Sequence, residues 1–172
     1  MKLAYVTSQK QGETDRLLSD LAADLQSSGL KLCGIVKEVD YSPTYQNGCD
    51  MSVRVLPDGP VIKITQNLGK GSDACRLDPA ALTDAVAQVE RRGFEDIDLF
   101  ILNKFGPEEC GGRGFCSVLG KALEHDVPVL VGAGTAGVEA FQAFSGGLAK
   151  GLPDNVTALR DWCVASRREA KD

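Results

Sequence analysis

A short stretch near the start of the chain combines the residue types of a phosphate-binding loop: Thr7-Ser8-Gln9-Lys10-Gln11-Gly12-Glu13-Thr14. Against the pattern G-x-x-x-x-G-K-[ST], Gly12 and Thr14 match, whereas Thr7 replaces the first glycine and Glu13 replaces the lysine. Backbone N–H groups at a helix start bind oxyanions without any side chain, and Lys10 offers a displaced positive charge. We therefore predict Lys10, Gly12 and Thr14 as ligand-binding residues. The alternative is a plain strand-to-helix turn in which Thr14 caps the helix and Glu13 points outward.

The end of a strongly apolar strand at 98–102 carries a second candidate group, Asn103 and Lys104. In open α/β sheets ligands bind beyond the carboxyl ends of the strands, here after Val6, Val36, Leu102 and Val131. Nucleoside triphosphatases with a P-loop hold an acidic residue at such an end to order Mg²⁺. An amide and an ammonium group stand there instead, so we predict that Lys104 binds the anion directly, its charge moved to a neighbouring strand. A solvated surface lysine in a site that has lost its function is the alternative.

The loop that follows supplies the remaining candidates. Arg113 lies within Gly111-Gly112-Arg113-Gly114, where glycines let the backbone approach a ligand and the guanidinium suits an oxyanion. Glu108 and Glu109 precede it. These carboxylates are predicted either to orient a water molecule as catalytic residues or to pair with Arg113 and Lys104.

The six cysteines and the single histidine predict no metal site by their spacing. No C-x-x-C pair occurs, and a reducing cytosol disfavours a disulfide framework. Cys33 and Cys163 are predicted to lie in the core and His125 on the surface. A metal held by loop thiolates stays open as an alternative, and the cysteines near loops are Cys49, Cys75, Cys110 and Cys116.

The elements that must position these residues alternate between strands and helices. Apolar runs predict strands at 3–6, 32–36, 98–102 and 127–131, and helical periodicity predicts helices at 14–28, 79–92, 115–124, 138–144 and 156–168. Alternating residues at 51–55 and 61–64 flank a Pro/Gly turn, which predicts an antiparallel hairpin. The expected fold is a three-layer α/β domain with a mostly parallel sheet and a hairpin insertion.

Composition limits the classes of partner. The length of 172 residues predicts a single domain over 1–172, and a net charge of −5 argues against a general nucleic-acid binder. The sequence contains neither an apolar run long enough to span a membrane nor a signal peptide, so we expect no membrane partner and a cytoplasmic protein. The hairpin edge at 51–64 is a candidate surface for a homo-oligomer.

Blocks along nearly the whole chain resemble the uncharacterised bacterial DUF2478 family. The most specific block runs from Asn103-Lys104-Phe105-Gly106 to Gly112-Arg113-Gly114-Phe115, and Val127-Pro128-Val129-Leu130-Val131-Gly132 follows it. The family is similar in layout to P-loop nucleoside triphosphatases of the THEP1 type and is often encoded near molybdate-related genes. The resemblance implies a link to molybdate or tungstate. In THEP1-type proteins a strand ends in an acidic pair, and Asn103-Lys104-Phe105-Gly106 stands in that place here, which weighs against Mg²⁺-dependent hydrolysis.

Three functions follow as hypotheses. The first is a degenerate P-loop protein that binds an oxyanion (molybdate, tungstate or phosphate) or a nucleotide, in molybdenum metabolism. The second is a slow nucleoside triphosphatase that uses Lys10 or Lys104 in place of the missing lysine. The third is a protein-interaction module with a vestigial site.

Overall fold

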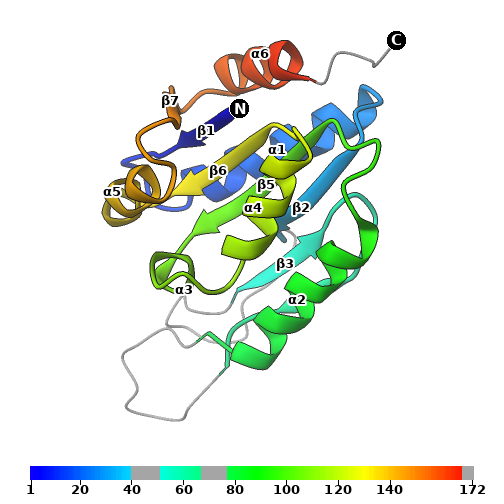
Figure 1. Cartoon of the computed structure of the whole chain (residues 1–172), viewed down its shortest axis with the longest axis vertical. Coiled ribbons are helices and arrows are strands. Elements are labelled where there is room, and N and C mark those ends of the chain that lie inside the picture. Colours follow the sequence, from blue (N-terminus) through cyan, green and yellow to red (C-terminus); the bar gives the residue numbers. More distant parts are fainter. Residues whose placement is uncertain (40–50, 67–76, 168–172) are drawn as a thin grey trace.

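A seven-stranded sheet in the order β4-β3-β2-β5-β6-β1-β7 forms the centre of the computed structural model, which describes residues 1–39, 51–66 and 77–167 (Figure 1). The strands are β1 (Leu3–Val6), β2 (Leu32–Lys37), β3 (Ser52–Val55), β4 (Val61–Lys63), β5 (Leu99–Phe105), β6 (Val129–Ala133) and β7 (Lys150–Leu152). The helices are α1 (Glu13–Ser27), α2 (Pro79–Arg92), α3 (Pro107–Cys110), α4 (Cys116–Glu124), α5 (Thr135–Phe144) and α6 (Val156–Ser166).

The sheet is parallel from β2 through β5, β6 and β1 to β7, and its other edge is an antiparallel hairpin. β1 pairs with β6 and β7 in parallel, as β5 does with β2 and β6. β3 pairs with β2 and β4 in antiparallel fashion. The predicted parallel sheet and hairpin insertion are confirmed, whereas the short edge strand β7 was not predicted.

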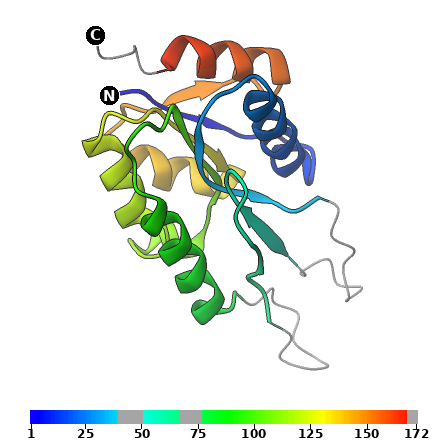
Figure 2. The ribbon, with the colours of Figure 1, turned by 90° about the vertical axis from the view of Figure 1, so that its right-hand side faces the viewer.

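Helices cover both faces of the sheet and create two apolar cores. On β5, Phe100 and Leu102 belong to the core beneath α2, α4 and α5, whereas Leu99 and Ile101 belong to the core with α1 and α6. Figure 2 shows α2 and α4 on one side of the sheet and α1 on the other. Burial of each large apolar side chain contributes about 1.5–3 kcal/mol. The predicted three-layer α/β fold is confirmed.

β5 is longer than predicted, because the apolar run does not end the strand. Asn103 and Lys104 lie inside β5, in an irregular stretch where its register with β6 shifts between Leu102 and Phe105. Phe105 is buried, and the centroid of its ring lies 5.1 Å from that of the Phe141 ring. This apolar contact extends the strand past two polar residues, which periodicity alone did not indicate.

α5 and α3 also depart from the sequence prediction. α5 begins at Thr135 rather than at 138, and its Gly137 allows close packing, since a Cβ there would lie 2.9 Å from the carbonyl oxygen of Phe105. The glycines at 132–137 are typical of a turn, but the segment is helical from Thr135 onward and Gly137 serves helix packing. The short helix α3 begins at Pro107, in a segment predicted as loop.

Turn-forming residues at 40–48 predict a loop, and this segment lies outside the described residues, as does most of the polar, glycine-containing stretch 66–78. The helix predicted at 79–92 is described and is confirmed. The Asp78 side chain accepts hydrogen bonds from the amides of Ala80 and Ala81, and Pro79 is the first helical residue. Within the described ranges, no helix is long and apolar enough to cross a membrane.

Candidate functional site

The loop between β1 and α1 ends in Gly12, whose backbone has the left-handed conformation that glycine adopts most easily. Gly12 has φ +74° and caps α1 without a side-chain hydrogen bond, so Thr14 is not the cap. The amide of Glu13 donates to the carbonyl of Lys10 at 3.2 Å. The amides of Thr14 and Asp15 donate to no residue in the described part of the chain. They are the free donors expected at a helix start, where an anion can bind.

The first residue of the same loop holds an unpaired hydroxyl. The Oγ1 atom of Thr7 is buried and has no hydrogen-bond partner among the described residues. Buried hydroxyl groups usually have a partner, because an unpaired one costs about 1–3 kcal/mol. Thr7 occupies the position of the first glycine in the phosphate-loop pattern. An unsatisfied donor therefore lies at the start of the predicted loop.

The carboxylate at the lysine position of the pattern is neutralised within its own helix. Glu13 accepts hydrogen bonds from Arg16, at 2.8 Å from Nη2 and 3.2 Å from Nε. An unpaired Glu13 carboxylate would repel a phosphate at this position, and the sequence prediction did not include its pairing with Arg16. The spacing of three residues on a helix was the available signal. Their pairing reduces the repulsion that Glu13 would exert on an anion.

Asp15, Lys37 and Asn103 form a polar network where β2, β5 and α1 meet. Asn103 Nδ2 donates to Asp15 Oδ1 at 3.0 Å, and Asn103 Oδ1 accepts from the backbone amide of Lys37 at 3.0 Å. Lys37 Nζ lies 3.3 Å from Asp15 Oδ2. Asn103 is 1% exposed, so its side-chain hydrogen bonds form inside the protein. The three residues come from separate parts of the sequence and meet at the carboxyl ends of the strands.

Lys10 and Lys104, the lysines predicted to bind the ligand, are both exposed. Neither ammonium group has a hydrogen bond or an ion pair with any residue that the structure describes. β5 is not the neighbour of β1, because β6 lies between them. The expectation that a positive charge moved to a neighbouring strand was therefore wrong about the strand order, and the binding role of Lys104 stays a prediction.

The loop after β5 is organised around Glu109, which is 6% exposed. Its Oε2 accepts from the amide of Gly106 and its Oε1 from the amide of Phe115, both at 3.0 Å. Gly114 has φ +58°, and a Cβ there would lie 2.1 Å from Glu109 Oε1. Both carboxylate oxygens therefore serve the loop backbone, and the catalytic role of Glu109 stays a prediction.

Glu108 and Arg113 pair with each other on the surface of that loop. Arg113 Nε lies 2.8 Å from Glu108 Oε2. The hydrogen bond from the Arg113 guanidinium lowers the pKa of the Glu108 carboxyl, which makes it a weaker base. Pairing was one of the two alternatives for these residues. Their catalytic and ligand-binding roles are untested predictions.

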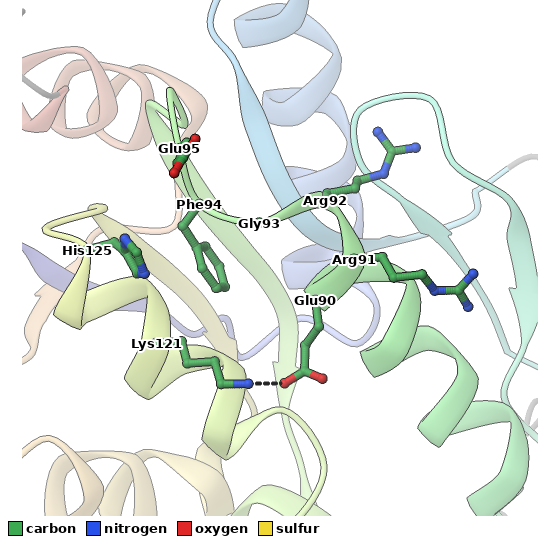
Figure 3. A pocket seen from close by; sticks show the side chains of 8 residues that line it. All are labelled: Glu90, Arg91, Arg92, Gly93, Phe94, Glu95, Lys121 and His125. Atoms are coloured by element: carbon green, nitrogen blue, oxygen red, sulfur yellow. Dashed lines mark hydrogen bonds and ion pairs between the residues drawn. The ribbon is translucent and has the colours of Figure 1, made fainter.

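A hollow of about 350 Å³ lies away from these residues, between the ends of α2 and α4 (Figure 3). Its lining includes the ion pair of Lys121 with Glu90 at 2.7 Å, and the rings of Phe94 and His125, whose centroids are 5.6 Å apart. α2 and α4 lead into β5 and β6, so this hollow lies at the amino ends of the strands. Ligands of open α/β sheets bind at the other end. His125 is exposed, as predicted.

Metal-binding side chains do not gather within the described ranges. No group of three or more histidine, cysteine or acidic residues there could hold an ion. Cys33 and Cys163 are fully buried, as predicted. Cys116 is half-buried and donates to the carbonyl of Glu109 at 3.2 Å, and burial raises the pKa of its thiol. Cys49 and Cys75 lie outside the described residues.

A family model described as a protein of unknown function, DUF2478, matches residues 3–162 of the chain. The chain belongs to the DUF2478 family. The resemblance predicted from the sequence blocks is thereby confirmed.

Two known proteins are similar to this DUF2478 chain. The Molybdenum import ATP-binding protein ModC 2 of Bradyrhizobium diazoefficiens is 33% identical over 163 residues, which is 94% of this chain but only 18% of that relative's length. A solution structure of a human cancer-related nucleoside triphosphatase has a TM-score of 0.62 at 16% identity and covers 98% of this chain and 100% of its own. The second likeness shows that the two proteins share an α/β fold.

Proposed function

We propose that this protein binds a phosphate-like oxyanion, free or as part of a nucleotide, at the loop between β1 and α1. The observation that carries the proposal is the pair of unused amides, those of Thr14 and Asp15, at the start of α1. They follow a glycine in the left-handed conformation at the carboxyl end of an inner strand. The fold shared with a nucleoside triphosphatase supports the same location.

Binding is favoured over hydrolysis by the state of the candidate bases. Glu109 uses both carboxylate oxygens within its loop, and Glu108 is paired with Arg113. Neither holds a carboxylate free to orient water. Asn103 donates to Asp15 where a P-loop nucleoside triphosphatase has its Mg²⁺-ordering acid. A slow nucleoside triphosphatase is the second candidate, and the shared fold is the observation in its favour.

The anion that we propose is a tetrahedral dianion of the molybdate, tungstate or phosphate kind, and the setting is molybdenum metabolism in the cytoplasm. The support is the similarity to part of a protein named for molybdenum import. Tetrahedral oxyanions present the same oxygen acceptors to backbone amides as phosphate does. The third candidate, an interaction module, requires no anion.

A thermal-unfolding screen tests the proposed function. A ligand that binds only the folded state raises the melting temperature, by an amount that grows with its concentration relative to Kd. We expect molybdate, tungstate, phosphate or a nucleoside diphosphate to raise it, whereas chloride at equal ionic strength does not. If none of these anions raises it, the binding function is wrong and the interaction module is favoured.

A phosphate-release assay separates binding from hydrolysis. The purified protein is incubated with ATP or GTP and Mg²⁺, and inorganic phosphate is followed over time. We expect no release above the buffer control. Turnover that Lys104→Ala abolishes would establish the triphosphatase and refute a purely binding role.

A further inference from the structure

We propose that Lys37 supplies the positive charge for the anion at the first turn of α1, in place of a metal ion. This inference rests on the anion-binding function proposed above and adds the identity of its cation. Lys37 is the last residue of β2, and its ammonium lies 3.3 Å from the carboxylate of Asp15. Asp15 is the third residue of α1, so the ammonium lies beside the turn that carries the unused amides.

Lys37 is held in place at its backbone and at the end of its side chain. Its amide donates to Asn103 Oδ1, and its ammonium pairs with Asp15. Asn103 in turn donates to Asp15, which closes the network. A cation that is already held loses less conformational freedom when it binds an anion. The Lys37 side chain is 34% exposed, so an anion from solvent can reach it.

The same network leaves no place for Mg²⁺ on these groups. One oxygen of Asp15 accepts from the Asn103 amide and the other pairs with Lys37. An amide N–H and an ammonium group both repel a cation, whereas Mg²⁺ requires free oxygen ligands. The ammonium of Lys37 is therefore the cation that this arrangement can offer to an anion.

The charges at the first turn balance only while Lys37 is present. Glu13 is paired with Arg16, and Asp15 is paired with Lys37. Loss of the Lys37 charge leaves Asp15 uncompensated beside the unused amides, where it repels an incoming anion. The exposed Lys10 and Lys104 have no described partner to hold them, so they are weaker candidates for this role.

Calorimetric titration of the full chain with sodium molybdate and with inorganic phosphate tests the inference. Each titration is run once in excess EDTA and once in excess MgCl₂. We expect the same Kd in both buffers, because Lys37 replaces the metal. Lys37→Gln is expected to weaken binding about tenfold or more, the effect of losing one charge-assisted hydrogen bond. Lys37→Arg, which keeps the charge, is expected to recover most of the affinity.

Lys31→Gln is the matched control, because Lys31 is exposed and directly precedes the opposite end of β2. It should bind like the wild type. The double variant Asp15→Asn/Lys37→Gln removes both charges of the pair, so no unpaired carboxylate destabilises its fold. Thermal unfolding checks that each variant is folded. We expect the double variant to bind more tightly than Lys37→Gln, because Asp15 no longer repels the anion, but more weakly than the wild type, which keeps the ammonium.

Two results separate the failure of this inference from the failure of the proposed function. Binding that requires MgCl₂, or that is unchanged in Lys37→Gln and in the double variant, overturns the role of Lys37 and leaves anion binding intact. Wild-type protein that binds neither molybdate nor phosphate in either buffer overturns both proposals.

Discussion

Asn103 is the residue that joins the candidate site to the fold. Its side chain connects α1 to β2 through Asp15 and the amide of Lys37, and it is almost fully buried. The sequence predicted Asn103 only as an amide in the place of a Mg²⁺-ordering acid. The network was not predictable, because Asn103 is 88 positions from Asp15 and Asp15 is 22 positions from Lys37. Only the loop before α1 was predicted as part of the site, because the phosphate-loop pattern consists of residues that are close together in the sequence.

Asn103→Leu is expected to lower the free energy of unfolding by about 2–3 kcal/mol. Leucine has the same branching as asparagine but forms no hydrogen bonds, so Asp15 Oδ1 and the Lys37 amide lose this partner. Unpaired buried polar groups are costly. Urea unfolding measures the change. Lys104→Gln, an exposed neighbour on the same strand, should change stability by less than about 0.5 kcal/mol. Equal stability of Asn103→Leu and the wild type would contradict the structural role of the network.

Two core thiols predict how stability depends on alkaline pH. Burial raises the pKa of Cys33 to about 11 and that of Cys163 to about 12, from an ordinary value of 9.0. Above pH 9 the unfolded chain releases these protons while the folded chain keeps them. The free energy of unfolding therefore falls as the pH rises from about 9 to about 11, by up to about 1.4 kcal/mol per pH unit for each thiol.

Urea unfolding across this pH range, repeated on the variant Cys33→Ala/Cys163→Ala, isolates the contribution of the thiols. The variant is less stable at pH 7, because it loses buried side-chain volume. Its stability should nevertheless fall less steeply above pH 9. Parallel curves for the two proteins would show that the buried thiols do not cause the alkaline loss.

At the scale of the elements, the sequence predicted strands and helices wherever apolar periodicity was strong. β1, β2, the hairpin and α2 match their predicted ranges within about two residues. Two of the failures share one physical cause, since contacts between elements overrode the local pattern. Phe105 extends β5 through its packing against Phe141, and Gly137 lets α5 begin early against β5. The three-residue strand β7 is too short to give a periodic signal.

Two glycines in different elements are expected to respond in opposite ways to alanine. At Gly34 in β2, φ is +111° and a Cβ would lie 1.9 Å from the carbonyl oxygen of Ile101. Gly34→Ala should cost more than about 4 kcal/mol or prevent folding. At Gly120 in α4, a Cβ meets nothing within 4 Å, so Gly120→Ala should raise stability by about 0.5–1 kcal/mol. Thermal unfolding of both variants measures these changes, and a stable Gly34→Ala would contradict the close pairing of β2 with β5.

At the scale of the whole molecule, two cores share one sheet, which predicts cooperative unfolding. Trp162 on α6 packs against the core of α1, on the other face from α2 and α4. We expect tryptophan fluorescence and far-ultraviolet circular dichroism to give the same urea midpoint. The chain contains one tryptophan, so its fluorescence reports on that face alone. Separate midpoints would mean that the α6 side unfolds independently and that the layers are not one cooperative unit.

The arrangement of the whole sheet also determines at which end of its strands the candidate site lies. The carboxyl ends of the parallel strands bring together the loop before α1, the end of β2 and the end of β5, although these segments are far apart in the sequence. The hollow lined by Phe94 and His125 lies at the amino ends. The central claim is that an anion binds at the first of these two places.

Residue-resolved NMR titration of the uniformly ¹⁵N-labelled chain with molybdate or phosphate tests that claim most directly. We predict saturable shifts of the amide signals of Gly12, Thr14 and Asp15, together with that of Lys37, and no comparable shifts at Phe94 or His125. Shifts confined to the hollow at Phe94 and His125, or no saturable shift in the loop before α1, would contradict it.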